Sequence, residues 1–280
     1  MKFGKKPRIY DERVPQYSKL IEQSGKLSLA VLPVSVNYTT VLPHNLGMYG
    51  NDTLGDCTCA AIYHAKQVWS ANTSTIDTEP QNDAILAYEQ FCGYVPGNPN
   101  TDNGGVEQTV LTDWMNLGAP TGANGTNRDN LVAFVEVNQH NLQNVKQAIL
   151  EGGLIYIGFE VPAFFNTSSA IWDVDPNGDN TIIAGHAVVI AGYDDTTSMF
   201  TLISWGSVYK MTYAFFEQFV EEAYMLVSKQ WIEATGNTPA GLTLSELEAT
   251  MSSLKWNGSS RTKRRKHRRV KKQTGLKPPK

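Results

Sequence analysis

The sequence contains 280 residues, of which 41% are hydrophobic and 18% are charged. That is enough apolar side chain for one large domain or two small lobes with a buried core, and it excludes a chain that is disordered throughout. Residues 261–280 hold 11 of the 24 Lys and Arg and none of the 27 Asp and Glu, so a body of formal charge −14 precedes a tail of +11.

The sequence shows no sign of a membrane span or a secretory signal. No segment has the roughly 20 consecutive apolar residues of a spanning helix, and Met1–Arg8 is followed by polar sequence, not by an apolar signal core. The three cysteines, two of them one residue apart at Cys57 and Cys59, cannot form a disulfide framework. We therefore expect a soluble protein of a reducing, cytoplasmic compartment, with no membrane association. The sequence carries no indication of oligomeric state.

The first half of the chain is predicted to be mainly helical. Residues 1–30 are polar and charged, and an extended segment leads from there into a turn-rich loop at 50–56. A helix is predicted to begin at Cys57, because apolar residues recur at helical spacing as far as Trp69 with no Gly or Pro between them. Two further helices are expected, at 83–91 and 106–117.

The second half is predicted to be mainly β. Short apolar runs at 131–137, 154–159, 187–191 and 200–204 are typical of strands, and one helix is expected among them at 141–150. Thr243 followed by Glu246 matches a capping box, so a terminal helix is expected from there to about residue 254.

Cys57 and His186 are the residues most suited to chemistry. A thiol becomes a nucleophile when its thiolate is stabilised, and a helix N-terminus and a nearby imidazolium are two means of doing this. Cys57 lies at a predicted helix start, and His186 is an ionisable residue at the start of an apolar strand. Ser204 lacks the Gly-x-Ser-x-Gly pattern of a serine nucleophile.

Several motifs, in this order along the chain, resemble those of the papain-like (C1-type) cysteine peptidases. They are Leu54-Gly55-Asp56-Cys57, Asn103-Gly104-Gly105, His186-Ala187-Val188 with Gly192-Tyr193, and Ile203-Ser204-Trp205-Gly206. The resemblance covers about residues 30–228 and suits a divergent bacterial or phage-like member. It implies an α+β, two-lobed fold with a mainly helical N-terminal lobe, a C-terminal antiparallel β-barrel-like lobe and the site between them.

The resemblance also implies roles for individual residues. Cys57 would be the nucleophile, His186 its base, and Asn51 a donor to the oxyanion. Gly104 and Gly105 would line the substrate backbone, and Trp205 would shield the histidine. The implied function is thiol-dependent hydrolysis of peptide or protein substrates, with no cofactor and no metal.

Departures from the family pattern bear on activity. Ile203 stands where the family has an Asn that orients the histidine, so either the pair works as a dyad or another group substitutes. Asn51 replaces a Gln, Thr58 replaces a Trp, and Asp56 would oppose the thiolate if ionised. The alternative is therefore a catalytically weakened papain-like binding protein or pseudoenzyme.

The chain is predicted to divide into four parts: a polar N-terminal segment (1–30), the peptidase-like domain (31–230), a helical extension (231–258) and a basic disordered tail (259–280). Within the tail, residues 261–272 are expected to contact nucleic acid or another polyanion through phosphate-directed charge. No inhibitory propeptide is expected, because only 56 residues precede Cys57 and about 25 of them resemble the first strand of the mature domain.

Overall fold

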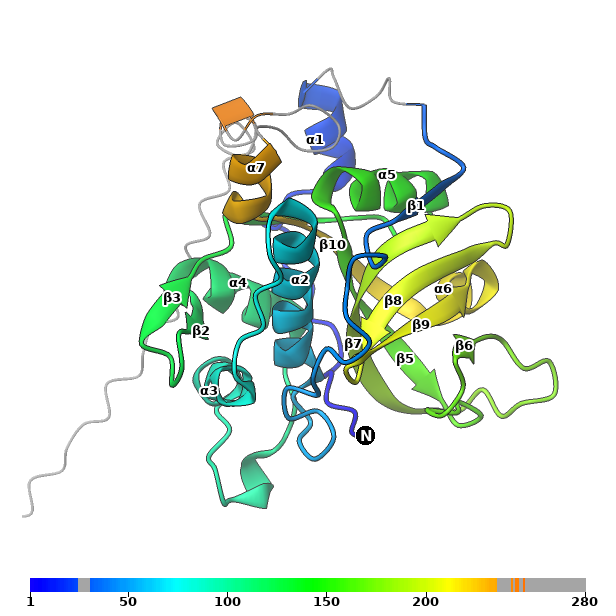
Figure 1. Cartoon of the computed structure of the whole chain (residues 1–280). Coiled ribbons are helices and arrows are strands. Elements are labelled where there is room, and N and C mark those ends of the chain that lie inside the picture. The colour runs from blue at the N-terminus through cyan, green and yellow to red at the C-terminus, as the bar shows by residue number, and fades with distance from the viewer. Residues whose placement is uncertain (25–30, 236–242, 244, 247–248, 250–280) are drawn as a thin grey trace, which may run out of the picture.

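The computed structural model describes residues 1–24, 31–235, 243, 245–246 and 249. Three helices gather on one side of the molecule (Figure 1): α2 (Cys57–Thr73), α3 (Gln81–Cys92) and α4 (Glu107–Leu117). A large, mostly antiparallel sheet forms the other side. The predicted α+β class and the two-lobed arrangement are confirmed.

Helix α2 is the central helix of the molecule. Its first fourteen residues, Cys57–Ser70, are all buried, because α2 packs against α3 and α4 on one side and against the sheet on the other. Small Ala side chains at 60, 61 and 65 permit this close approach. Helix α2 thus places its N-terminus at the junction of the two lobes.

The sheet has eight strands, and seven of them follow one path. In spatial order these are β4 (Ala133–Glu136), β10 (Val220–Val227), β5 (Ile155–Pro162), β7 (Ile182–Asp194), β8 (Met199–Ser204), β9 (Ser207–Thr212) and β6 (Ile171–Trp172), while β1 (Ser35–Asn37) pairs with β7 off the path. All of these pairs are antiparallel except β6 with β9. Among the described strands the path is open, so the expected barrel-like lobe is a curved sheet and not a closed barrel.

Several elements were not predicted. They are α1 (Tyr17–Ser24), the 3-10 turn η2 (Pro99–Thr101), the hairpin of β2 (Ala119–Thr121) with β3 (Asn127–Asp129), α6 (Tyr213–Phe219) and the strands β6, β9 and β10. Helix α7 (Lys229–Thr235) overlaps the start of the predicted helical extension. The predicted helix at 141–150 is α5 (Leu142–Gly152). The capping box is present as predicted, since Thr243 N–H donates to Glu246 Oε2 at 2.9 Å and Glu246 N–H to Thr243 Oγ1 at 3.2 Å.

Parts of the chain lie outside the description. The basic tail predicted at 259–280, and with it residues 261–272, falls outside the described residues, as does most of the helical extension. Within the described part, no helix has the length and apolar character needed to cross a membrane.

A buried hydrogen bond joins the two lobes. Tyr156 Oη on β5 donates to the carbonyl oxygen of Thr58 on α2 at 2.8 Å, and Tyr156 is fully buried.

Tyr156→Phe removes this bond and little volume, so the free energy of unfolding should fall by about 1 kcal/mol. Urea denaturation measures the change. Tyr10, which is 63% exposed, supplies the matched control, and Tyr10→Phe should leave stability unchanged. Equal effects of the two variants would contradict a bond that holds the lobes together.

Candidate active site

Cys57 is the first residue of α2, and it lies against β7. Its side chain is buried, and the backbone N–H groups of Ala187 and Gly4 are near enough to its sulfur to lower the pKa of the thiol. Ala187 directly follows His186 on β7, so the two candidate catalytic residues come from elements in direct contact. The helix start predicted at Cys57 is therefore correct, and the long-range pairing of α2 with the histidine strand is present.

Burial controls the protonation of the thiol. The pKa of Cys57 is raised to about 12, chiefly by loss of hydration and also by Asp56 and Glu107, while the N–H groups of Ala187 and Gly4 act in the lowering direction. Asp56 is itself fully buried, which raises the pKa of its carboxyl well above its usual range. Burial thus favours the neutral form of Asp56, and its opposition to a thiolate is weaker than the sequence suggested.

His186 lies on β7 opposite Phe159 of β5 and is fully buried. Burial lowers the pKa of its imidazole to about 3. Trp205 stacks on the ring, with centroids 4.4 Å apart and planes 16° from parallel. Trp205 and Gly206 form the tight turn between β8 and β9, with φ of 45° and 71°, so the indole is set over His186 by an uncommon backbone conformation.

A polar group does stand behind the imidazole. His186 Nε2 lies 2.8 Å from Ser204 Oγ, while Ile203, at the position considered in the sequence, is fully buried in β8 opposite Val189. Ser204 was considered only as a nucleophile and its role beside the histidine was missed. The sequence signal for this role was the neighbouring residue, because Ser204 directly precedes Trp205, whose indole covers the His186 ring.

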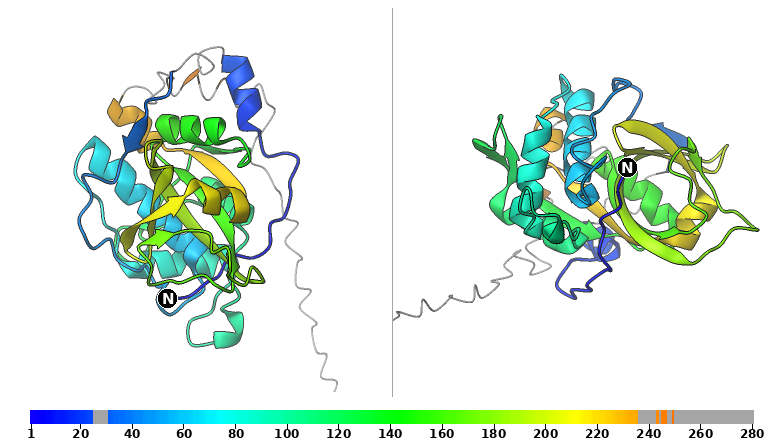
Figure 2. Two further views of the ribbon diagram at one scale, coloured as in Figure 1. Left: turned by 90° about the vertical axis from the view of Figure 1, so that its right-hand side faces the viewer. Right: turned by 90° about the horizontal axis from the view of Figure 1, so that it is seen from below.

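The first eight residues, here called the N-terminal strap, lie across Cys57 in an extended line. Figure 2 shows this dark blue segment passing between the helices and the sheet. Backbone hydrogen bonds tie it to both lobes: Gly105 N–H to Gly4 O at 2.8 Å, Lys6 N–H to Gly105 O at 2.8 Å, and Lys5 N–H to Gly185 O at 3.0 Å. These contacts of the strap were not predicted, because the sequence of residues 1–30 indicates only a polar segment.

The remaining predicted site residues all contact the strap. Gly104 lies so close to the strap that a side chain at this position would overlap the Gly4 carbonyl. Asn51 is buried, and its side-chain N–H groups donate to the carbonyl oxygens of Lys2 and Leu54, each at 3.1 Å. The strap residue Phe3 packs edge-to-face on His186, with ring centroids 5.5 Å apart. The strap thus contacts each of the site residues that were predicted to surround Cys57.

The strap is not bound as a peptide about to be cut. Attack on a peptide requires its carbonyl carbon to face the sulfur. Here the strap group that acts on the Cys57 thiol is the Gly4 N–H, which lowers the thiol pKa. This geometry explains how a peptide can rest beside the thiol without being a substrate.

Other sulfur and ligand groups stand apart from this site. Cys59 of α2 is fully buried and Cys92 of α3 is half-buried, and the two thiols are close enough to shift each other's pKa. In the part of the chain that the structure describes, no group of three or more His, Cys, Asp or Glu side chains could hold a metal ion.

Gly4→Val should open the site, because a side chain at Gly4 would overlap the backbone carbonyl of Gly55. Water would then reach Cys57, and its pKa should fall from about 12 toward the ordinary value of 9.0. Alkylation of Cys57 by iodoacetamide at pH 8 should accelerate at least ~10-fold, since the thiolate is the reacting form. Timed labelling with peptide mapping measures the rate at each cysteine.

Cys59 is the internal control for that measurement. It is fully buried in the core, so its labelling reports unfolding and should stay slow. An unchanged rate at Cys57 in the folded variant would show that the strap does not close the site.

Comparisons with known proteins support the fold. No family model matches the chain, and no curated protein matches it in sequence. Among solved structures, xylellain, a cysteine protease from Xylella fastidiosa, superimposes with a TM-score of 0.61 at 19% identity, covering 81% of this chain and 96% of that one.

Two further structures agree. ProCathepsin B S9 from Trypanosoma congolense superimposes with a TM-score of 0.57 at 10% identity, covering 81% of this chain and 86% of its own. The bromelain protease from Ananas comosus, in complex with the E64 inhibitor, gives 0.50 at 13% identity, covering 71% and 100%. The chain therefore has the two-lobed fold of the papain-like cysteine proteases.

Proposed function

We propose that the protein is a cysteine peptidase whose active site consists of Cys57 and His186. The observation that carries the proposal is the strap itself. An extended peptide lies along Gly105 and Gly185 with its backbone hydrogen-bonded, directly over a thiol at a helix N-terminus. A cleft that binds a peptide backbone at a candidate nucleophile suits peptide or protein substrates.

The chemistry follows from these positions once a substrate replaces the strap. His186 takes the thiol proton, and the Cys57 sulfur attacks the peptide carbonyl carbon. The carbonyl oxygen becomes an oxyanion, for which the Cys57 backbone N–H and Asn51 Nδ2 are the proposed donors. His186 then gives its proton to the departing amine, and water hydrolyses the thioester to release the acid and restore the thiol.

Asn51 suits its role because it already holds a carbonyl oxygen. Its side-chain N–H donates to the Lys2 carbonyl of the strap at 3.1 Å, and departure of the strap frees that donor. Ser204 is proposed as the positioning residue of His186, in place of the Asn that Ile203 replaces. Gly104, Gly105 and Trp205 keep the substrate-binding roles assigned from the sequence.

The second candidate is a papain-like protein that binds peptides without cutting them. The observation in its favour is the protonation state of the closed site, with the pKa of Cys57 near 12 and that of His186 near 3. Both groups are neutral at pH 7, and a neutral thiol is a poor nucleophile. The two candidates differ in whether opening the cleft reverses these shifts.

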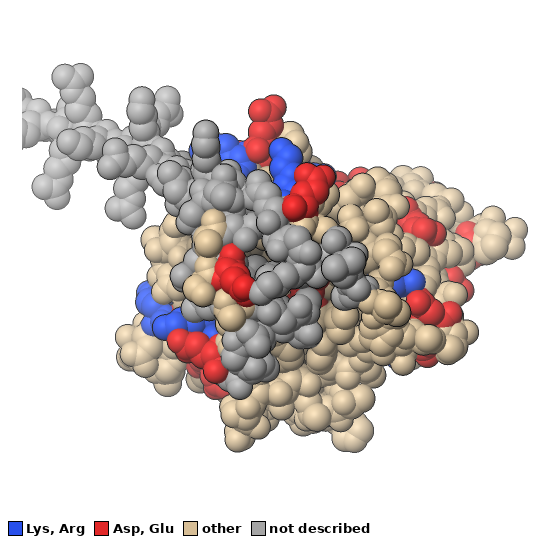
Figure 3. Space-filling view, turned by 90° about the horizontal axis from the view of Figure 1, so that it is seen from above, with Lys and Arg blue, Asp and Glu red and all other residues tan. Residues whose placement is uncertain are grey.

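The tail and the compartment remain proposals. On the face seen from above, described acidic and basic side chains are interspersed and form no single basic patch (Figure 3). We propose attachment to nucleic acid or another polyanion through residues 261–272, where Lys and Arg are concentrated in the sequence. Three free cysteines, with no disulfide among the described residues, suit the proposed cytoplasmic location.

Labelling by a peptide carrying a thiol-directed electrophile tests the enzyme. In the Gly4→Val protein, Cys57 should react at least ~100-fold faster than a free cysteine at pH 7, because general-base and oxyanion effects act together. His186→Ala in the same background should remove most of this advantage, and Cys57→Ala should abolish labelling. Reaction at the rate of a free cysteine would favour the binding protein.

Ser204→Ala should slow turnover without unfolding the protein. Loss of one hydrogen bond to His186 should reduce kcat about 5- to 10-fold. Because Ser204 Oγ can accept from a protonated imidazole, its loss should lower the His186 pKa and move the alkaline limb of the pH–rate profile to lower pH. Ser204→Thr keeps the hydroxyl and should restore both. A slower enzyme with an unmoved profile would assign Ser204 a purely structural role.

A further inference from the structure

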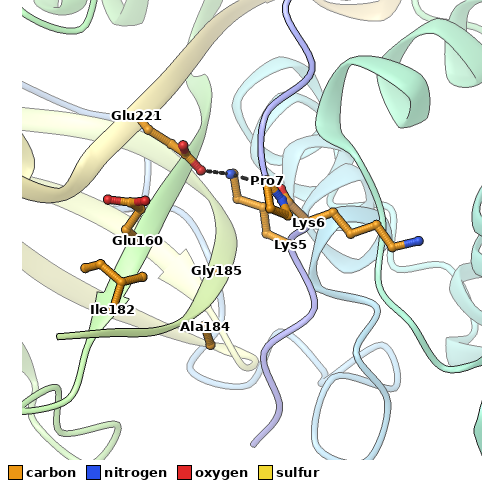
Figure 4. Close-up of a pocket in the computed structure, with 8 residues that line it drawn as sticks. All are labelled: Lys5, Lys6, Pro7, Glu160, Ile182, Ala184, Gly185 and Glu221. Carbon is orange, nitrogen blue, oxygen red and sulfur yellow. Dashed lines mark hydrogen bonds and ion pairs between the residues drawn. The ribbon is translucent and has the colours of Figure 1, made fainter.

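The strap residue Lys5 enters a buried acidic pocket beside the site. Its side chain is fully buried, and its Nζ lies 2.8 Å from Glu222 Oε1 and forms an ion pair with Glu221. Figure 4 shows Lys5 reaching from the strap toward Glu221. Burial would lower the pKa of Lys5, but Glu107 and Glu222 outweigh it and the pKa is raised. Lys5 is held as a cation.

A β-bulge builds one wall of this pocket. The pairing of β10 with β5 shifts register between Val220 and Glu222. Consecutive residues of a regular strand point to opposite faces, but a bulge turns its extra residue toward the same side. Glu221 and Glu222 therefore both reach Lys5. Tyr224 Oη donates to Glu222 Oε2 at 2.7 Å and holds this carboxylate in place.

The other wall comes from the helical lobe. Glu107, the first residue of α4, is fully buried and neither of its carboxylate oxygens has a hydrogen-bond partner. Between the walls lies Gly158, the cross-strand neighbour of Glu222, where any side chain would overlap both Lys5 and Glu107. The absence of a side chain at Gly158 leaves the space that the lysine fills.

The pocket is unfavourable when empty. Removal of Lys5 would leave Glu107 and Glu222 close together and buried without the cation that pairs with Glu222. Buried carboxylates require a cation or protons, and an aliphatic side chain supplies neither. The position of Lys5 also fixes the register of the strap. With Lys5 in the pocket and its N–H bonded to Gly185 O, the preceding residue, Gly4, is hydrogen-bonded to Gly105 and its N–H acts on the Cys57 thiol.

We propose that this pocket, formed by Glu107, Glu221, Glu222 and Gly158, selects a basic side chain of the peptide substrate at the position next to the residue that lies over Cys57. Lys5 fills it in the strap as a substrate lysine or arginine would. This proposal rests on the proposed peptidase function, since only an enzyme has a substrate. The selectivity of the pocket for a basic side chain is a binding property and can be tested separately.

Peptide binding tests the pocket without any chemistry. The host is the full chain with Gly4→Val and Lys5→Met, which keeps its own lysine out of the pocket. The probes are the octapeptide of residues 1–8 and the same peptide with norleucine, which lacks only the ammonium group, at the fifth position. Calorimetry should show at least ~10-fold tighter binding of the lysine peptide. Equal affinities, or no binding of either peptide, would overturn the proposal.

Removal of the carboxylate charges of the pocket tests whether they cause the preference for the lysine peptide. Adding Glu222→Gln should reduce the lysine advantage to less than about threefold, and Glu107→Gln provides a second variant should the first not fold. Glu217, an exposed residue of α6, is the matched control, and Glu217→Gln should keep the full advantage. An undiminished advantage in both pocket variants would place the lysine elsewhere.

Labelling then separates the two proposals. In the strap Gly4 precedes Lys5, and the bridge of Lys5 to Gly105 is parallel. Acyl-X-glycyl fluoromethyl ketones, with X as lysine, norleucine or glutamate, run in the opposite direction, and bound in this way they place X in the pocket and the electrophile at Cys57. Faster labelling by the lysine probe supports both proposals. Labelling without preference overturns the pocket and leaves the peptidase. A lysine preference in binding with no labelling supports the pocket and overturns the peptidase.

Discussion

Exclusion of water from the junction of the two lobes governs the rest of the site. Helix α2 brings Cys57 against β7, and the strap seals the remaining side, so thiol and imidazole are both buried. Burial favours the neutral form of each group, and it acts on the two pKa values in opposite directions. In the proposed enzyme, a catalytic ion pair and a closed cleft are therefore alternatives, and the position of the strap would decide between them.

The same burial makes the strap specific to its own cleft. Its backbone takes part in hydrogen bonds that any extended peptide could make with Gly105 and Gly185, whereas Lys5 supplies a charge that few segments would place at that position. Backbone pairing gives affinity and the buried ion pair gives register. The acidic pocket thus explains how a short segment without secondary structure is held in one alignment between two lobes.

Much of the fold and part of the site could be predicted from local signals. Ala and apolar spacing after Cys57 marks a helix start, and the apolar run after His186 marks a strand. The strap could not be predicted, because Lys2–Arg8 is a polar sequence whose partners lie far away along the chain, as with Lys5 and Glu221, 216 residues apart. The pocket depends on the bulge before Glu222, and a bulge leaves no trace in a period-two pattern.

The covalent link between strap and cleft has one more consequence. Because both belong to a single chain, the strap meets its site at an effective concentration fixed by chain geometry, on the order of millimolar for a short flexible connection. Dilution of the protein leaves that occupancy unchanged. A peptide in solution displaces the strap only when its concentration times its affinity exceeds the effective concentration of the strap times the affinity of the strap. A single cut in the chain between residue 8 and α1 would turn the contest into an ordinary bimolecular one.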